Sequence, residues 1–259
     1  METDPAALAA GPYRTPHGLA ARAAVYAWQQ PRIDLIGAAV DALTALSDGA
    51  VVVDVGCGPG RYLRRLGATR PELRPVGIDV SIGMLRAAGQ RRVAAGSANA
   101  VPLRTGSVDA ALAMHMLYHL PRPEAGLAEL RRVLRPGGRL LVSTNDDTVD
   151  GLWQLFRDAG LDRLPVSGRW SLAGATDALQ VAGFADVRER AFDYVLDIPA
   201  PGPVLDYFDS CRSADSTEPG WRQVRRNVAA AVASSIERHG SVRCRGRVGV
   251  LTARSIDSR

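Results

Sequence analysis

The feature that most constrains this chain is an apolar strand that runs directly into a glycine-rich turn. Residues 50–55 (AVVVDV) form a continuous β-branched run, which is typical of a parallel strand buried on both faces. The turn GCGPG follows at 56–60, and residues 61–66 begin a helix. Glycine lets a backbone turn sharply and lie close to a ligand, and a helix N-terminus presents free N–H groups. The segment therefore predicts a strand–turn–helix unit that binds a ligand.

Strands and helices alternate after this turn. Expected strands lie at 75–79, 94–98, 108–114 and 139–144, and expected helices run from Ser81 to about 94 and over 123–134, with a turn at 136–138. This alternation predicts a parallel α/β sheet. Farther along, we expect helices over 172–182, 201–211 and 221–238 and strands over 184–198 and 247–253. Residues 1–18 read as a loop, and helices are expected over 19–30 and 32–46.

Composition narrows the class of protein. The 259 residues allow one large domain, and no apolar run reaches the ~18 residues of a membrane span. No signal peptide is recognised, so we expect a cytoplasmic protein. The net charge is +5, but all 32 basic residues are arginine, which reads as a compositional bias rather than a nucleic-acid surface. The arginine runs 61/64/65, 131/132/135, 222/225/226 and 243/245/247 are expected to be solvated faces.

Cysteine and histidine do not show metal-ligand spacing. Cys57, Cys211 and Cys244 lie far apart, so we expect neither a zinc site nor a disulfide framework, and no metal is assigned. Cys57, inside the glycine turn, is expected to be a small filler rather than a nucleophile.

Two carboxylates accompany the glycine turn. Asp54 lies inside the strand, and Asp79 ends the next strand about twenty residues later, where a carboxylate can accept both hydroxyls of a ribose. The spacing is G-x-G-x-G rather than the G-x-G-x-x-G of dinucleotide folds. Because Asp54 would repel phosphate, the turn suits a ligand with a cationic amine.

Four segments in order, VVVDVGCGPG, PVGIDVS, SANAVPLRTGSVDAALAMHMLYHL and RRVLRPGGRLLVSTN, resemble the class I S-adenosylmethionine-dependent methyltransferases across about residues 50–145. The resemblance implies a Rossmann-like α/β fold with a seven-stranded sheet of order 3-2-1-4-5-7-6, its last strand antiparallel. It also implies S-adenosylmethionine as cofactor and transfer of a methyl group to an oxygen or nitrogen of a small molecule in secondary-metabolite biosynthesis.

The resemblance also assigns residues. Asp54 and the glycines would surround the methionine part, Asp79 would hold the ribose, and Ser81, Ile82 and Met84 would border the adenine. Ser97 stands where the family usually has an aspartate that reads the adenine amino group, so we expect weaker binding, by about 1 kcal/mol. The full cofactor set is Asp54, Gly56, Cys57, Gly58, Gly60, Asp79, Val80, Ser81, Met84, Ser97, Ala98, Asn99, Met114 and His115.

Candidate catalytic residues follow the fourth strand: His115, Tyr118 and His119, any of which could accept a proton from the acceptor or simply pack in the core. Tyr26 or Arg22 could reach the site from an N-terminal lid. An acceptor pocket could be lined by aromatic residues that could equally belong to the core, and Asp146 and Asp147 could hold a substrate amine. These aromatic residues are Trp153, Phe156, Trp170, Tyr207 and Phe208.

The predicted organisation is an N-terminal arm and helical lid over 1–48, then a methyltransferase domain over 49–259 with a helical insertion at about 200–240. The expected partner is a small-molecule substrate; no membrane is expected, and a nucleic-acid partner is disfavoured. A homodimer is one option for an oligomeric state that stays open. Alternative functions are a peptide or RNA methyltransferase, a non-catalytic S-adenosylmethionine-binding protein and a nicotinamide oxidoreductase.

Overall fold

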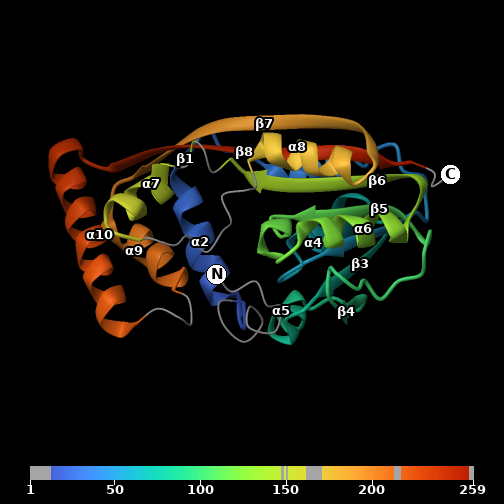
Figure 1. The fold of residues 1–259 in the computed structure, drawn as a ribbon, viewed down its shortest axis with the longest axis horizontal. Helices are drawn as coiled ribbons and strands as arrows, with labels where there is room; N and C mark the ends of the chain where they lie inside the picture. The colour runs from blue at the N-terminus through green and yellow to red at the C-terminus, as the bar shows by residue number, and fades with distance from the viewer. Residues whose placement is uncertain (1–12, 147–148, 150, 162–170, 213–216, 257–259) are drawn as a thin grey trace.

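A computed structural model describes residues 13–146, 149, 151–161, 171–212 and 217–256. Its centre is one eight-stranded mixed sheet (Figure 1). In sheet order the strands are β1 (Gln29–Gln30), β7 (Phe184–Ile198), β8 (Val242–Ser255), β6 (Leu134–Asn145), β5 (Val108–Met114), β2 (Val51–Val55), β3 (Arg74–Asp79) and β4 (Val93–Ala95).

The predicted sheet order is confirmed. Without β1, the order read from β4 is the expected 3-2-1-4-5-7-6, and β8 runs antiparallel to both of its long neighbours, β6 and β7. The two-residue strand β1 extends this sheet by pairing antiparallel with β7. Its residues were expected inside a helix. Instead Gln29 and Gln30 lie opposite Leu196 and Val195, a pairing that depends on a strand far along the chain.

Helices cover both faces of the sheet. They are α2 (Pro16–Ala24), α3 (Leu35–Asp41), α4 (Arg61–Thr69), α5 (Ile82–Ala88), α6 (Pro123–Val133), α7 (Gly151–Asp158), α8 (Leu172–Val181), α9 (Pro201–Ser210) and α10 (Glu218–His239), with short 3₁₀ helices η1 (Val25–Trp28) and η2 (Leu117–His119). Adjacent strand residues serve opposite faces: Val53 packs with α6 and α8, and Val52 packs with α3 and α4. This alternation follows from the two-residue period of a strand.

A further helical layer lies at one end of the sheet. The ends of β7 and β8 extend beyond the other strands, and α7, α9, α10 and η1 pack there around Phe156 and Phe208 (Figure 1). Helix α2 lies in contact with α9 on one side and α5 on the other. The helices at 201–210 and 218–239 fall where helices were expected. The domain boundaries at 48 and 49 stay predictions.

Several expected boundaries were wrong. The helix expected over 32–46 spans only Leu35–Asp41, and the strand expected at 94–98 is Val93–Ala95. The turn at 136–138 lies inside β6, because Leu134 already pairs with Val108. The last strand begins at Val242 rather than 247. The helix expected from Ser81 to about 94 ends at Ala88, although Ser81 caps it as predicted by accepting the Met84 N–H at 3.2 Å.

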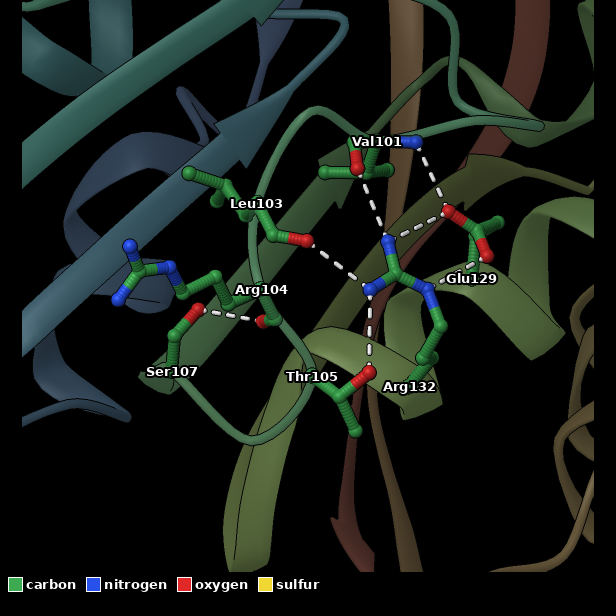
Figure 2. A network of polar contacts seen from close by, with 7 residues as sticks. All are labelled: Val101, Leu103, Arg104, Thr105, Ser107, Glu129 and Arg132. Carbon is green, nitrogen blue, oxygen red and sulfur yellow. Dashed lines mark hydrogen bonds and ion pairs between the residues drawn. The ribbon is translucent and has the colours of Figure 1, made fainter.

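One arginine expected on a solvated face instead fixes a loop. Figure 2 shows the Arg132 guanidinium on α6 paired with Glu129 at 2.7 and 2.9 Å and donating to the carbonyls of Val101 and Leu103, both at 2.9 Å, and to the Thr105 hydroxyl at 3.3 Å. Each guanidinium nitrogen thus has a partner. These bonds hold the connection between β4 and β5 against α6.

Candidate active site

A cavity of about 490 Å³ lies at the carboxyl ends of β2, β3 and β5. Ligands of open α/β sheets bind at this edge. We call one wall the glycine-loop side; it is formed by Asp54, Gly56, Cys57, Gly58, Asp79, Val80, Met84, Ser97 and Ala98. We call a second group of lining residues the helical side; it is formed by Tyr13, Arg22, Tyr26, Tyr118, His119 and Tyr207.

The glycine turn is held by backbone hydrogen bonds. The N–H groups of Gly56 and Cys57 both donate to the carbonyl of Ile78, at 2.8 and 3.1 Å. Gly58 has a φ of 52°, in the left-handed region that favours glycine. A Cβ at this position would meet only Leu19, at 3.9 Å, so the backbone of Gly58 borders open space in the cavity. A ligand can therefore lie directly against it.

Asp79 is buried and organises two segments at once. Its Oδ2 accepts the Gly58 N–H and its Oδ1 accepts the Ser81 N–H, both at 2.8 Å. Burial raises the pKa of this carboxyl, and the backbone N–H groups oppose that effect. Because a carboxylate oxygen can accept two hydrogen bonds, each oxygen keeps capacity for a ligand hydroxyl.

Asp54 is the least satisfied polar side chain of the glycine-loop side. It is 1% exposed, and neither of its carboxyl oxygens has a hydrogen-bond partner. Burial, with the nearby charge of Asp79, raises the pKa of Asp54 to about 7. An unpartnered buried carboxyl is costly, and a ligand that brings a cation or N–H donors would remove that cost.

Three residues of the predicted cofactor set lie outside the cavity wall: Gly60, Ser81 and Asn99. Gly60 begins α4 and faces Ala88, Ser81 caps α5, and Asn99 is exposed. Ser97 lines the cavity, and its hydroxyl accepts the Asn99 N–H at 3.2 Å. Ile82, expected at the adenine, is 48% exposed and is not part of the wall.

The predicted catalytic residues all line the cavity, together with Met114 at the end of β5. His115 has a φ of 53°, a backbone conformation that non-glycine residues adopt mainly where surrounding structure enforces it. Its N–H donates to the Ser143 hydroxyl at 3.0 Å. Burial lowers the pKa of His115 to about 4, and burial together with Arg22 and His115 lowers that of His119 to about 3. Both imidazoles are therefore neutral at pH 7.

The N-terminal segment contributes to the helical side through Tyr13. Its hydroxyl shares a hydrogen bond of 2.8 Å with Nε2 of His119, and its carbonyl accepts the Ser81 hydroxyl at 2.7 Å. The ring of Tyr118 lies edge-on to that of His119, with centroids 4.5 Å apart. Burial raises the pKa of Tyr13, so its phenol keeps its proton. A residue near the N-terminus and residues from the middle of the sequence thus meet at one imidazole.

Arg22 and Tyr26, suggested as lid residues, both line the cavity. Of the aromatic residues proposed for the pocket, Tyr207 lines it, whereas Trp153, Phe156 and Phe208 belong to the core of the helical layer. Asp146 is not part of the wall. Trp170 and Asp147 lie outside the described residues.

Sequence reasoning missed several wall residues, among them Tyr62, Asn145 and Asp34. Asn145 could have been found, because it directly follows the strand predicted at 139–144, at the ligand-binding edge. Tyr62 lies in the first turn of α4, directly after the glycine turn, which was also a usable signal. Asp34 caps α3 by accepting the Gly37 N–H at 2.8 Å, and nothing local placed it at the cavity.

Within the described ranges, no group of three or more His, Cys, Asp or Glu side chains is placed to hold a metal ion. Cys57, Cys211 and Cys244 are buried free thiols. Burial raises the pKa of Cys57, which agrees with a filler rather than a nucleophile. No described helix is both long enough and apolar enough to cross a membrane.

The sequence of this chain is similar to a protein-family model and to known proteins. Residues 53–142 match the family model described as a methyltransferase domain. Over 201 residues the chain is 34% identical to an uncharacterised protein in a transposon of Streptomyces fradiae, covering 74% of this chain and 56% of that protein. Over 108 residues it is 39% identical to a tRNA (carboxymethyluridine(34)-5-O)-methyltransferase of Macaca fascicularis, covering 40% and 16%. The chain therefore spans about half or less of the length of these two relatives.

The fold also matches solved structures. The YcgJ protein of Bacillus subtilis superimposes with a TM-score of 0.62 at 16% identity, covering 86% of this chain and 98% of that one. At this identity the likeness establishes the fold.

Proposed function

Because this chain belongs to the class I S-adenosylmethionine-dependent methyltransferases, we propose that it transfers a methyl group to an oxygen or nitrogen atom of a small molecule. S-adenosylmethionine is the methyl donor typical of this class. The observation that carries the proposal is a single cavity whose two walls differ, with carboxylates and open glycine backbone on one wall and aromatic side chains on the other.

The glycine-loop side fits the cofactor. The unpartnered oxygens of Asp54 suit a cationic amine, and the two oxygens of Asp79 keep capacity for two ribose hydroxyls. Gly58 leaves open space where the ligand would lie against backbone. Met84, Ser97 and Ala98 complete this wall and are proposed to border the adenine.

When bound, S-adenosylmethionine supplies an electrophilic methyl group on a sulfonium. The chain has three tasks: to align the acceptor, to exclude water and to take up a proton where the acceptor carries one. Alignment alone can contribute about 7–11 kcal/mol. Tyr13, Tyr26 and Tyr207 are proposed to align the acceptor and exclude water.

The neutral imidazoles are proposed to take up the proton that the acceptor loses. His119 keeps its neutral form at pH 7, but its low pKa makes it a weak base. It is therefore proposed to assist acceptors with an acidic hydroxyl group, such as phenols, with His115 and Tyr118 as its neighbours in the wall. Tyr13 orients it through the 2.8 Å hydrogen bond.

The small-molecule class is favoured over RNA or peptide because the N-terminal segment and α9 both contribute to the acceptor wall. A cavity of about 490 Å³ lies within the usual range of small-molecule sites. The match to the tRNA methyltransferase covers only 40% of this chain. Free thiols in the described residues agree with the proposed cytoplasmic location.

The test is transfer of label from methyl-tritiated S-adenosylmethionine to a panel of phenols, amines and carboxylic acids, with bulk tRNA and a peptide mixture in parallel. Label in a small molecule and none in tRNA or peptide supports the proposal. Label in tRNA supports the alternative. Cofactor binding without transfer to any class would favour a non-catalytic binding protein.

A further inference from the structure

Arg22 occupies an unusual position on the helical side of the cavity. It lies on α2, and its NH1 donates to the carbonyl of Ser210 at the C-terminal end of α9, at 3.1 Å. The guanidinium lies over the ring of Tyr13, with its central carbon 4.8 Å from the ring centroid. Arg22 is therefore fixed from two sides while it still lines the cavity.

The charge of Arg22 has no counterion among the described residues. None of their ion pairs includes it. Its second terminal nitrogen, NH2, is buried and has no hydrogen-bond partner. The titratable groups that act on it are phenols and a thiol, which carry no charge at neutral pH: Tyr13, Cys211, Tyr207 and Tyr118.

Such an arrangement is costly without a ligand. A guanidinium keeps its proton in proteins, so Arg22 cannot escape the cost by becoming neutral. The buried NH2 group of Arg22 has lost its hydration without gaining a hydrogen bond in exchange. Arg132 shows what a structural arginine looks like in the same chain, since each of its nitrogens has a partner (Figure 2).

The chemistry of the missing partner follows from the donor group and its surroundings. The free NH2 of a planar guanidinium matches a planar carboxylate. The same wall offers the aromatic rings of Tyr13, Tyr26, Tyr118 and Tyr207, which favour an apolar, ring-shaped body. Asp54 and Asp79 belong to the glycine-loop side, so an anion held by Arg22 and a cationic amine held by Asp54 would bind to different groups of lining residues.

We propose that Arg22 binds the carboxylate of the methyl acceptor, and that the acceptor is a small aromatic acid. This inference rests on the proposed function, because it assigns the helical side to the acceptor. Arg22 is then a specificity-determining residue: it selects acids over their neutral amides and fixes the orientation of the ring.

The experiment measures binding rather than turnover. The purified chain is saturated with S-adenosylhomocysteine and titrated calorimetrically with three matched pairs: benzoate and benzamide, salicylate and salicylamide, phenylacetate and phenylacetamide. The variants are Arg22→Gln, Arg22→Lys and the control Arg91→Gln, which removes an exposed arginine outside the cavity wall. Affinity for S-adenosylhomocysteine is measured for each protein first.

We expect at least one carboxylate to bind wild type and Arg91→Gln at least about tenfold more tightly than its amide, because hydrogen bonds to charged groups contribute about 1.5–3 kcal/mol. Arg22→Gln should lose this preference, and Arg22→Lys should keep part of it. If wild type prefers none of the three acids, or if Arg22→Gln keeps the preference, the inference is overturned.

The two proposals fail in different ways. Wild type that binds S-adenosylhomocysteine but no acid overturns the acceptor assignment alone. Wild type that is folded and does not bind S-adenosylhomocysteine overturns the proposed function itself. Retention of S-adenosylhomocysteine affinity by Arg22→Gln shows that the variant is folded, so its loss of acid binding then counts as support.

Discussion

The two sides of the cavity are built by different kinds of interaction. On the glycine-loop side, neighbouring strands and turns bring the groups together, and backbone hydrogen bonds fix Gly56, Gly58 and Asp79. On the helical side, side chains far apart in sequence meet, as when Tyr13 bonds to His119. Each side leaves buried polar atoms without a hydrogen-bond partner: both carboxyl oxygens of Asp54 on the first side and NH2 of Arg22 on the second. This difference motivates the proposal that the two sides receive ligand groups of opposite charge.

The largest expected effect comes from filling the glycine-loop side. Gly58→Val should weaken S-adenosylhomocysteine binding by about a hundredfold, because the added methyl groups enter open space of the cavity. The left-handed backbone costs a side-chain-bearing residue about 1–2 kcal/mol and should lower the stability of the variant as well. Calorimetric titration measures the affinity, and circular dichroism checks the fold.

Gly49→Val is the matched control for backbone strain. Gly49 has a φ of 77° and no atoms within 4 Å of an added Cβ, and it is not part of the cavity wall. It should lower the melting temperature and leave the affinity unchanged. Equal affinity in Gly58→Val and wild type would contradict the placement of the ligand on the glycine-loop side.

The next effect is a pH dependence that belongs to Asp54. In the ligand-free protein its pKa is raised to about 7, so below that pH the carboxyl is mostly protonated and cannot pair with a cationic amine. Affinity for S-adenosylhomocysteine should therefore rise about tenfold from about pH 6 to about pH 8. The folded state binds the proton more tightly than the unfolded state, so stability of the ligand-free protein should fall over the same rise in pH.

Asp54→Asn is the control for this pH dependence. It should weaken binding at pH 8 and flatten both the affinity and the stability profiles. An unchanged pH profile in Asp54→Asn would assign the dependence to another group.

A smaller effect is expected on the helical side. His119→Ala should lower turnover by a few-fold up to about tenfold, less than a base of matched pKa contributes, because burial has lowered the pKa of His119 to about 3. Cofactor affinity should stay the same. His239→Ala, which removes an exposed histidine at the end of α10, is the control and should leave both quantities unchanged. If His119→Ala also lost affinity for S-adenosylhomocysteine, His119 would have to be assigned to the residues that bind the cofactor.

The smallest effect on the site is expected from the arginine that is fully paired. Arg132→Gln removes the bonds to Glu129 and to the loop after β4 and should lower the melting temperature by a few degrees, since the side chain is 34% exposed and its ion pair is partly screened. Affinities for S-adenosylhomocysteine and for benzoate should not change. A selective loss of benzoate binding would remove the contrast between Arg132 and Arg22.

The contrast between local and long-range interactions also explains which features could be predicted from the sequence. The strands at 108–114 and 184–198 and the Ser81 cap follow from local periodicity and turn chemistry. The glycine turn, Asp54 and Asp79 were predicted for the same reason, whereas the sheet order and the other residues of the glycine-loop side were expected only from the family resemblance. Buried Val242 and Cys244 alternate with exposed Arg243 and Arg245, and this alternation is a local signal that β8 begins before residue 247. The arginines made the same segment look like a solvated face.

The rest depends on long-range contacts. Strand β1 exists because Gln29 and Gln30 meet β7, and no local pattern contains that partner. Arg132 looked like one member of a solvated run, yet its position on α6 brings it to the carbonyls of Val101 and Leu103. In the same way, the bond from Tyr13 to His119 joins residues 106 positions apart, so only the folded chain could reveal it.

The central claim is that the cavity at the ends of β2, β3 and β5 binds the cofactor. Calorimetric titration of the folded wild-type chain with S-adenosylhomocysteine at about pH 8 tests it most directly, because this ligand presents the amine and ribose without the chemistry. Saturable binding at one site per chain is expected. Absence of measurable binding by a protein that unfolds cooperatively would contradict it.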